Sequence, residues 1–368
     1  MRAMTNLSRA AVLILAVLLG VCGCKRSSIK EAPITGRASD GAITMTPRWQ
    51  EGKRFIFRVE SVTSSQVPRK NTAQIIQTET SLGQDLAFSV TNVAPDGSRV
   101  LQMEILAVQM ETGRDDGITT SFDSGNKVMQ VEDTPIIQRL RKFVGLKLQF
   151  HLSPSNKVTR VDGIRELSDR QSGGNAGRGA AAGVIGRYFN QQFYRDLVEM
   201  GMLPKTPVKI GDTWAVDRPA NSGASGNPFP AVFTYTFRGW QQRDGANCAR
   251  LEFVGEFKPA TARTNDSAVG QIVRAAVQPK LKEGSITGQS WYSPEHTLAV
   301  ETIYNQSITA KSTSVRRVRS PKTGTNSVEI VEMDDYTNAP PPVATTTTTT
   351  TSHQTTSIKL LEVEPLQP

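Results

Sequence analysis

The sequence predicts a β-rich protein of the α+β class, built from antiparallel strands with one or two helices packed on the sheet. Runs in which apolar and polar residues alternate recur along the chain, a pattern typical of strands with one buried face. Two pairs of such runs are joined by an Asp-Gly pair, at residues 96–97 and 244–245. Glycine accepts the positive φ that tight hairpin turns require, so each Asp-Gly pair predicts an antiparallel hairpin.

The first half of the folded region contains five predicted strands. They cover residues 55–59, 86–93, 99–108, 146–152 and 158–161. Asp96-Gly97 joins the second strand to the third. Ser153-Pro154-Ser155-Asn156 joins the fourth to the fifth, and its proline and small polar residues favour a turn. These two connections predict two hairpins in this half.

Two stretches with a helical repeat of apolar residues interrupt the strands. A helix is predicted over residues 135–144, where Pro135 suits the first turn and Gly145 can end the helix. A second helix is predicted over residues 184–200. One stripe of large apolar side chains recurs on it every four residues, namely Phe189, Phe193 and Leu197. Such a stripe is most often part of a core.

The second half returns to strands. They are predicted at residues 232–240, 249–257, 284–292 and 297–307. The order strand, Asp-Gly, strand occurs in both halves, and in both a glutamate follows the aspartate by eight residues, at Glu104 and Glu252. Two related β-halves that meet near residues 164–205 would explain this repeat, and so would ordinary hairpin chemistry.

The predicted β-rich globular domain covers residues 49–314, and the composition changes on both sides of it. Residues 24–48 are polar and contain small residues, which is typical of a tether. Beyond the domain, a basic cluster at 316–319 is followed by a proline run and by the threonines of 345–351. These threonines offer no apolar face to bury, so residues 315–368 are predicted to be a disordered tail, with sugar on the hydroxyls as one option.

The first 23 residues have the composition of an export signal. Arg2 and Arg9 bracket the polar start, and the apolar run over 10–20 is too short to span a bilayer. Gly23 and Cys24 follow, an order that resembles the lipobox of bacterial lipoproteins. The resemblance implies cleavage before Cys24 and a diacylglyceryl group on its thiol. The alternative is an ordinary secretory signal beside an incidental cysteine.

The residue after Cys24 bears on the expected location. Lys25 stands where an aspartate retains lipoproteins at the inner membrane in some bacteria, so the outer membrane is expected, facing the periplasm or the surface. The formal net charge of +9 suits contact with anionic lipid head groups or an anionic wall polymer. Export argues against nucleic acid as a partner. Cys248 is expected to be a buried small hydrophobe.

The sequence contains no recognisable catalytic or metal-binding constellation. The three histidines, His151, His296 and His353, lack the spacing of zinc ligands, and no Gly-x-Ser-x-Gly motif occurs. The glycine-rich residues 173–179 are not followed by the Gly-Lys-Ser/Thr of a phosphate-binding loop. The prediction is therefore no catalytic residue, no metal and no cofactor.

Three short motifs resemble a family of uncharacterised bacterial lipoproteins that is known only as a domain of unknown function. They are Trp49-x-x-Gly52 with Phe55 and Phe57, Leu152 to Val158 leading to Val161-Asp162-Gly163, and Gly211-Asp212-Thr213-Trp214. The resemblance covers residues 49–314 and brings no known catalytic residues. The order of the elements is similar to the half-barrel lipoprotein-carrier fold, in which a curved antiparallel sheet holds helices in its mouth. That similarity implies an apolar ligand.

The expected function is non-enzymatic. We expect a lipid-anchored protein of the cell envelope that binds a hydrophobic or amphipathic molecule, or an envelope partner. If the half-barrel similarity holds, Phe189, Phe193 and Leu197 are the expected ligand contacts. One alternative is a structural or interaction lipoprotein without a small ligand. The other is a hydrolase whose site the sequence does not reveal.

Overall fold

The structure of the protein is a computed structural model. It describes residues 41–68, 74–115, 117, 119–126, 134–172, 185–186, 188–220, 229–258, 280–317 and 343–366. The predicted signal peptide, Cys24 and most of the predicted tether therefore lie outside the described residues. Within the described ranges no helix has the length and apolar character needed to cross a membrane.

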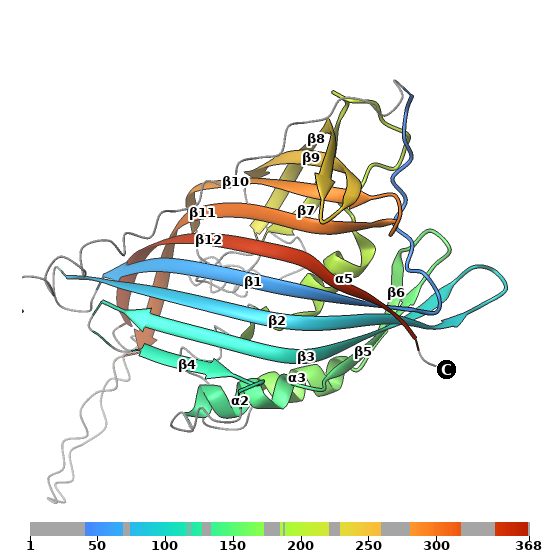
Figure 1. Cartoon of the computed structure of the whole chain (residues 1–368). Helices are drawn as coiled ribbons and strands as arrows, with labels where there is room; N and C mark the ends of the chain where they lie inside the picture. The colour runs from blue at the N-terminus through green and yellow to red at the C-terminus, as the bar shows by residue number, and fades with distance from the viewer. Residues whose placement is uncertain are drawn as a thin grey trace, which may run out of the picture. The chain divides into compact units, whose positions relative to one another are not determined.

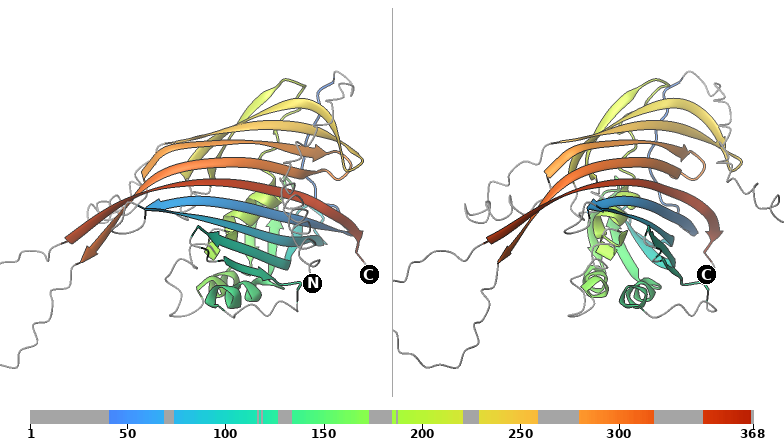
Figure 2. Two further views of the ribbon diagram at one scale, coloured as in Figure 1. Left: turned by 60° about the vertical axis from the view of Figure 1, so that its left-hand side comes forward. Right: turned by 90° about the vertical axis from the view of Figure 1, so that its left-hand side faces the viewer.

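One antiparallel sheet of 12 strands dominates the described part of the chain (Figure 1). In chain order the strands are β1 Lys53–Pro68, β2 Ile75–Val93, β3 Arg99–Arg114, β4 Thr119–Asp123, β5 Lys147–Leu152, β6 Val158–Asp162, β7 Thr213–Ala220, β8 Phe229–Arg243, β9 Ala246–Phe257, β10 Lys280–Ser293, β11 Leu298–Arg317 and β12 Val343–Pro365. Three helices accompany them, α2 Pro135–Phe143, α3 Ile164–Ser172 and α5 Gln191–Glu199. Figure 2 shows the sheet arched over the helices. The predicted fold class, a curved antiparallel sheet with helices on its inner face, is confirmed.

The chain begins the sheet at its centre and also ends there. The strand order is β6-β5-β3-β2-β1-β12-β11-β10-β9-β8-β7, with β4 paired to β3. The chain runs outward from β1 to the edge at β6, passes through α3 and α5 to the opposite edge at β7, and returns strand by strand to β12. The sheet is open in the described part of the chain, because the two edge strands do not pair with each other: β6 pairs with β5, and β7 pairs with β8. The common origin of the two halves stays a prediction.

The predicted hairpins are confirmed. Gly97 joins β2 to β3 with a φ of 85°, and Gly245 joins β8 to β9 with a φ of 84°. Both glycines lie in the left-handed region, where a side chain would add strain. The turn between β5 and β6 places Asn156 at a φ of 60°, and this side chain is buried.

The prediction of a disordered tail over 315–368 is wrong for residues 343–366. Strand β11 extends to Arg317, and β12 pairs with β1 over residues 351–365 and with β11 over residues 343–359. Threonine is β-branched and favours strands. The inward-facing side chains of β12 are partly polar and face polar partners, so the apolar alternation that identifies most buried strands is absent here.

The helices differ from the prediction in length and number. The first predicted helix, over 135–144, is confirmed: α2 starts at the predicted residue and ends one residue before the predicted end. The second predicted helix, over 184–200, is interrupted: Ile185, Gly186 and Tyr188 are helical, and α5 begins only at Gln191. The Asn190 side chain caps this start, because it accepts a hydrogen bond from the Phe193 backbone N–H at 2.7 Å. Helix α3 was not predicted, because its composition is mostly polar.

The inner face of the sheet has an apolar end and a polar middle. At one end Trp49 packs with Phe55, Phe57 and Phe88, with ring centroids 5.0 to 6.1 Å apart. Towards the middle, the buried side chains on the same strand faces are polar, namely Ser61, Thr63, Gln84, Ser290, Thr302, Gln306, Ser352, Gln354 and Thr356. A buried polar surface of this kind must be satisfied by hydrogen bonds.

Candidate functional site

The candidate site consists of two neighbouring pockets between α5 and the inner face of the sheet. We call them together the α5 groove. The smaller is lined by Val59, Ser61, Leu82, Gln84, Tyr188, Phe193, Tyr304, Gln354 and Thr356. The larger is lined by Phe193, Asp196, Leu197, Met200, Met202, Arg218, Pro219, Ala220, Phe233, Ile286, Ala299, Thr302, Tyr304, Gln306 and Ile358. Phe193 and Tyr304 line both pockets.

The lining of the larger pocket suits an organic ligand. The larger pocket comprises about 780 Å³ of empty space and the smaller about 340 Å³, and both figures include space that is open to solvent. Ligand pockets are mostly apolar, with a few polar groups that fix orientation. The apolar wall of the larger pocket comes from Leu197 and Met200 on one side and from Ile286 and Ile358 on the other.

The floor of the smaller pocket is a neutral hydrogen-bonding surface. Gln354 Nε2 donates to Ser61 Oγ at 2.9 Å and to Thr356 Oγ1 at 3.1 Å. The Oε1 atom of Gln354 is buried and accepts no hydrogen bond. On the other side, Tyr194 donates its hydroxyl to Gln84 Oε1 at 2.7 Å.

The larger pocket contains one cation and one carboxyl group. The Arg218 guanidinium lies 4.0 Å from the ring centroid of Phe233. Asp196 accepts a hydrogen bond from Gln192 Nε2 at 2.7 Å. Burial raises the pKa of Asp196 above its usual value, and the positive charge of Arg218 partly opposes this rise. Burial also raises the pKa values of Tyr235 and Tyr304.

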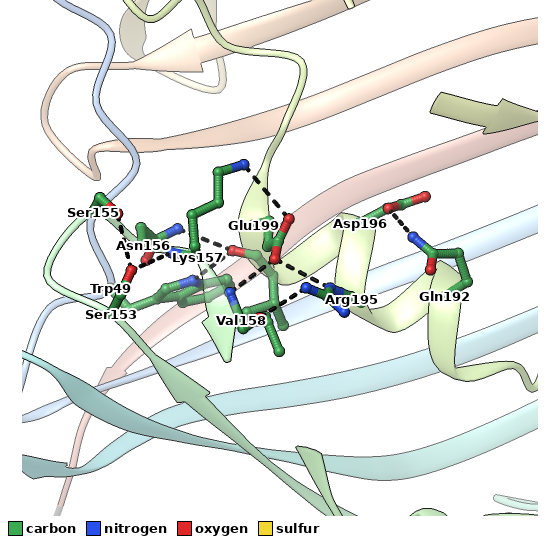
Figure 3. A network of polar contacts seen from close by, with 11 residues as sticks. Trp49, Ser153, Ser155, Asn156, Lys157, Val158, Gln192, Arg195, Asp196 and Glu199 are labelled. Carbon is green, nitrogen blue, oxygen red and sulfur yellow. Dashed lines mark hydrogen bonds and ion pairs between the residues drawn. The ribbon is translucent and has the colours of Figure 1, made fainter. Parts of the chain in front are cut away.

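Helix α5 is fixed at its C-terminal end by side chains from distant parts of the sequence (Figure 3). The Val198 carbonyl, which has no partner within the helix, accepts hydrogen bonds from Trp49 Nε1 at 3.1 Å and Asn156 Nδ2 at 3.3 Å. The Met202 carbonyl accepts one from Trp214 Nε1 at 2.9 Å. Each of these three donors belongs to a different one of the three family-like sequence motifs.

Two charged side chains of α5 attach the same end to the edge strand β6. Glu199 Oε1 accepts from the Val158 backbone N–H at 2.8 Å, and Arg195 donates to the Val158 carbonyl at 2.8 Å. Lys157 lies 3.6 Å from the other carboxylate oxygen of Glu199. The family-like motifs therefore have a structural role, which is to hold residues 198–202 in place beside the groove.

Two of the three predicted ligand contacts line the groove. Phe193 is half-buried between the two pockets, and Leu197 lies on the wall of the larger one. Phe189 does not line either pocket, because it is fully buried and its ring stacks on Phe143 of α2 with centroids 4.0 Å apart. Its place in the helical stripe suggested a contact, but Phe189 precedes the start of α5 and packs in the core.

The groove residues that were not predicted include the polar side chains Asp196, Arg218, Tyr304 and Gln354. Arg218 and Gln354 lie on β7 and β12, two strands that were not predicted. On β7 the half-buried residues Trp214, Val216 and Arg218 do alternate with exposed ones. That period of two was the signal available for Arg218.

The other chemically interesting residues lie away from the groove. His151 Nε2 lies 2.7 Å from Asp162 Oδ2 on the β5–β6 hairpin, and His353 is exposed on β12. Cys248 is buried, as expected, and burial raises its pKa to about 11. In the part of the chain that the structure describes, no three His, Cys, Asp or Glu side chains are grouped as a metal site.

A family of unknown function (DUF6263) matches residues 96–267. This match confirms the resemblance to a domain of unknown function. No curated protein matches the sequence.

Three solved structures show low similarity. A structure of lipovitellin that concerns its lipid–protein interactions is 9% identical, with a TM-score of 0.42, and the match covers 87% of this chain but only 26% of that one. DynF from dynemicin biosynthesis in Micromonospora chersina is 7% identical, with a TM-score of 0.16 and 92% of each chain covered. A DUF1329 family protein from Desulfovibrio piger is 9% identical, with a TM-score of 0.11 and coverages of 84% and 85%.

Proposed function

We propose that this protein is anchored in the cell envelope through a lipid on Cys24 and binds a hydrophobic or amphipathic molecule in the α5 groove, without catalysing a reaction. The observation that carries the binding proposal is the larger pocket. Its wall is formed by apolar side chains of α5 and of the sheet, with Arg218 and Asp196 as its charged groups, a lining that suits an amphipathic ligand.

The anchor follows from the order of arginines, apolar run and Gly23-Cys24 at the N-terminus. Replacing Cys24 by alanine is expected to abolish incorporation of radioactive palmitate in a bacterial host that processes lipoproteins. The unchanged chain serves as the positive control, and a Cys22→Ala variant should still be labelled. Continued labelling of the Cys24→Ala variant would contradict the proposed anchor.

Phe193 provides the test of ligand binding, because it is half-buried and lines both pockets. Phe193→Ala should weaken binding of N-phenyl-1-naphthylamine, a neutral apolar fluorophore, by roughly five- to thirty-fold, as expected for about 1–2 kcal/mol of lost apolar contact. Fluorescence titration of the full chain measures the affinity, and thermal melting monitors the fold.

Phe189→Ala is the matched control, since Phe189 is on the same segment but fully buried against Phe143. It should lower the free energy of unfolding by about 3–5 kcal/mol. Phe193→Ala should lower it by less. A Phe193→Ala variant that loses as much stability as Phe189→Ala and binds the fluorophore unchanged would favour an interaction protein without a small ligand.

A further inference from the structure

We infer that the larger pocket of the α5 groove selects amphiphiles with a single anionic head group, which Arg218 binds while the hydrocarbon chain lies against the apolar wall. The inference rests on the proposed function, because it names the class of ligand that the groove takes. It is carried by the position of Arg218 in the pocket wall, by its buried Nε atom without a hydrogen-bond partner and by the composition of the remaining wall.

Arg218 is positioned by the strand alternation of β7. It lies opposite Ala231 of β8, and its side chain covers the ring of Phe233, with the guanidinium carbon 4.0 Å from the ring centroid. A guanidinium over an aromatic face is held in a fixed plane. The side chain is half-buried and lines the larger pocket. The pocket wall therefore carries a positive charge in a fixed position, with the Phe233 ring on one side of the guanidinium.

Within the described ranges, Arg218 has no carboxylate at ion-pair distance, and its Nε atom is buried without a hydrogen-bond partner. Other arginines on the sheet are paired: Arg58 lies 2.8 Å from Asp85, Arg238 2.6 Å from Glu252 and Arg243 3.2 Å from Glu301. A buried donor without an acceptor is unfavourable by about 1–3 kcal/mol, and more when it is charged. A ligand oxygen would remove this penalty.

Tyr235 lies beside Arg218 but does not line the pocket. Its side chain is fully buried, and its ring stacks on Trp214 with centroids 5.8 Å apart. Arg218 lowers the pKa of Tyr235, although burial raises that pKa by more. A carboxylate or phosphate oxygen in the pocket can accept a hydrogen bond from the guanidinium of Arg218, and no ligand contact is assigned to Tyr235.

Asp196 is a carboxyl group that lines the same pocket, so an anionic head group must bind near it. It is not within ion-pair distance of Arg218 and accepts its hydrogen bond from Gln192 instead. Because burial raises the pKa of Asp196, its charged form is disfavoured. A cationic head group at Asp196 would leave Arg218 unpaired and would add a second positive charge beside Arg218. The anionic head is therefore the better match.

The rest of the wall suits a hydrocarbon chain. Leu197 and Met200 face Ile286 and Ile358 across the pocket, and Phe193 lies where the larger pocket meets the smaller one. A chain of methylene groups that starts at Arg218 can follow this wall towards Phe193. Burial of each methylene group contributes about 0.8 kcal/mol, so the tail supplies the affinity and the head supplies the selectivity.

The test compares amphiphiles that share one tail and differ in the head. Dodecanoate, dodecyl phosphate, dodecan-1-ol and dodecylammonium are titrated below their micelle-forming concentrations against the full chain with N-phenyl-1-naphthylamine bound. Each anionic compound should bind about tenfold or more tightly than the alcohol, and dodecylammonium should bind most weakly. Whichever anion binds more tightly identifies the head as a carboxylate or a phosphate. Acetate and inorganic phosphate, which lack the tail, should not displace the fluorophore at millimolar concentration.

Substitutions of Arg218 and of Asp196 should change the affinity for dodecanoate in opposite directions. Arg218→Gln should weaken dodecanoate binding about tenfold and leave dodecan-1-ol binding unchanged. Asp196→Asn should tighten dodecanoate and weaken dodecylammonium. Arg238→Gln is the matched control, because Arg238 is an exposed arginine of β8 that is paired with Glu252, and it should change none of the affinities.

Two results would overturn the inference. One is equal affinity for the four amphiphiles, and the other is an equal loss of affinity for dodecanoate and for dodecan-1-ol in Arg218→Gln. If Arg218→Gln does not fold, as judged by thermal melting, Arg218→Met carries the same test, because it also removes the positive charge. Failure of the proposed function is a different result, since N-phenyl-1-naphthylamine would then not bind the unchanged chain at all.

Discussion

A chain that ends at Asn338 should fail to form this sheet. Strand β12 lies between β1 and β11, with Phe55 opposite Val363, Thr302 opposite Ile358 and Val315 opposite Thr345. Without β12, the part of the sheet that runs from β6 to β1 is no longer joined to the part that runs from β11 to β7. The edges of β1 and β11 are then exposed. The free N–H and C=O groups of those edges and the uncovered side chains favour aggregation over folding.

Circular dichroism and thermal melting measure this effect. The shortened chain should show no cooperative melting transition, whereas a chain that ends at Leu366 should melt at the same temperature as the full chain. The comparison is sharp because the control removes only the two residues after Leu366. A chain ending at Asn338 that melts like the full chain would show that β12 is dispensable, which is what the threonine-rich composition alone had predicted.

Trp49→Ala should lower both the stability of the protein and its affinity for the probe. The indole is fully buried, contacts Phe55, Phe57 and Phe88, and donates a hydrogen bond to the Val198 carbonyl. The packing loss should lower the free energy of unfolding by about 3–5 kcal/mol. The Val198 carbonyl also loses one of its two side-chain donors, so probe affinity should fall although Trp49 does not line the groove.

Chemical denaturation of Trp49→Ala measures the first effect and fluorophore titration the second. Trp49→Phe keeps an aromatic ring but loses the N–H and part of the indole, so it should lower the free energy of unfolding by less than Trp49→Ala, about 1–2 kcal/mol. Gln50→Ala is the neighbouring control, since Gln50 makes one exposed hydrogen bond to the Glu295 carbonyl. Trp49→Ala with unchanged probe affinity would mean that the position of α5 does not depend on this contact.

The three family-like motifs were recognisable in the sequence, but their shared structural role was not. Trp49, the turn containing Asn156 and Trp214 were recognised as motifs, but nothing in their spacing indicated a shared role. The structure brings one donor from each to residues 198–202. Two of these contacts join residues more than 40 positions apart, and such contacts depend on which strands are neighbours and not on any local pattern.

The groove was only partly predictable for the same reason. Phe193 and Leu197 were found because a helical stripe is a local pattern. Arg218 was not, since a polar residue on a strand is equally compatible with solvent and with a pocket. Its environment is decided by the elements that cover that face, here α5.

The sequence by itself determined the β-rich class, the two Asp-Gly hairpins and the helix at 135–144, because alternation, turn chemistry and capping act between residues close in the chain. Only the tertiary structure decided that β12 belongs at the centre of the sheet. The polar inward side of β12 is acceptable there because Ser61 and Thr356 form hydrogen bonds with Gln354. Whether a threonine-rich strand is ordered depends on partners about 290 residues away, which no local pattern in the sequence can reveal.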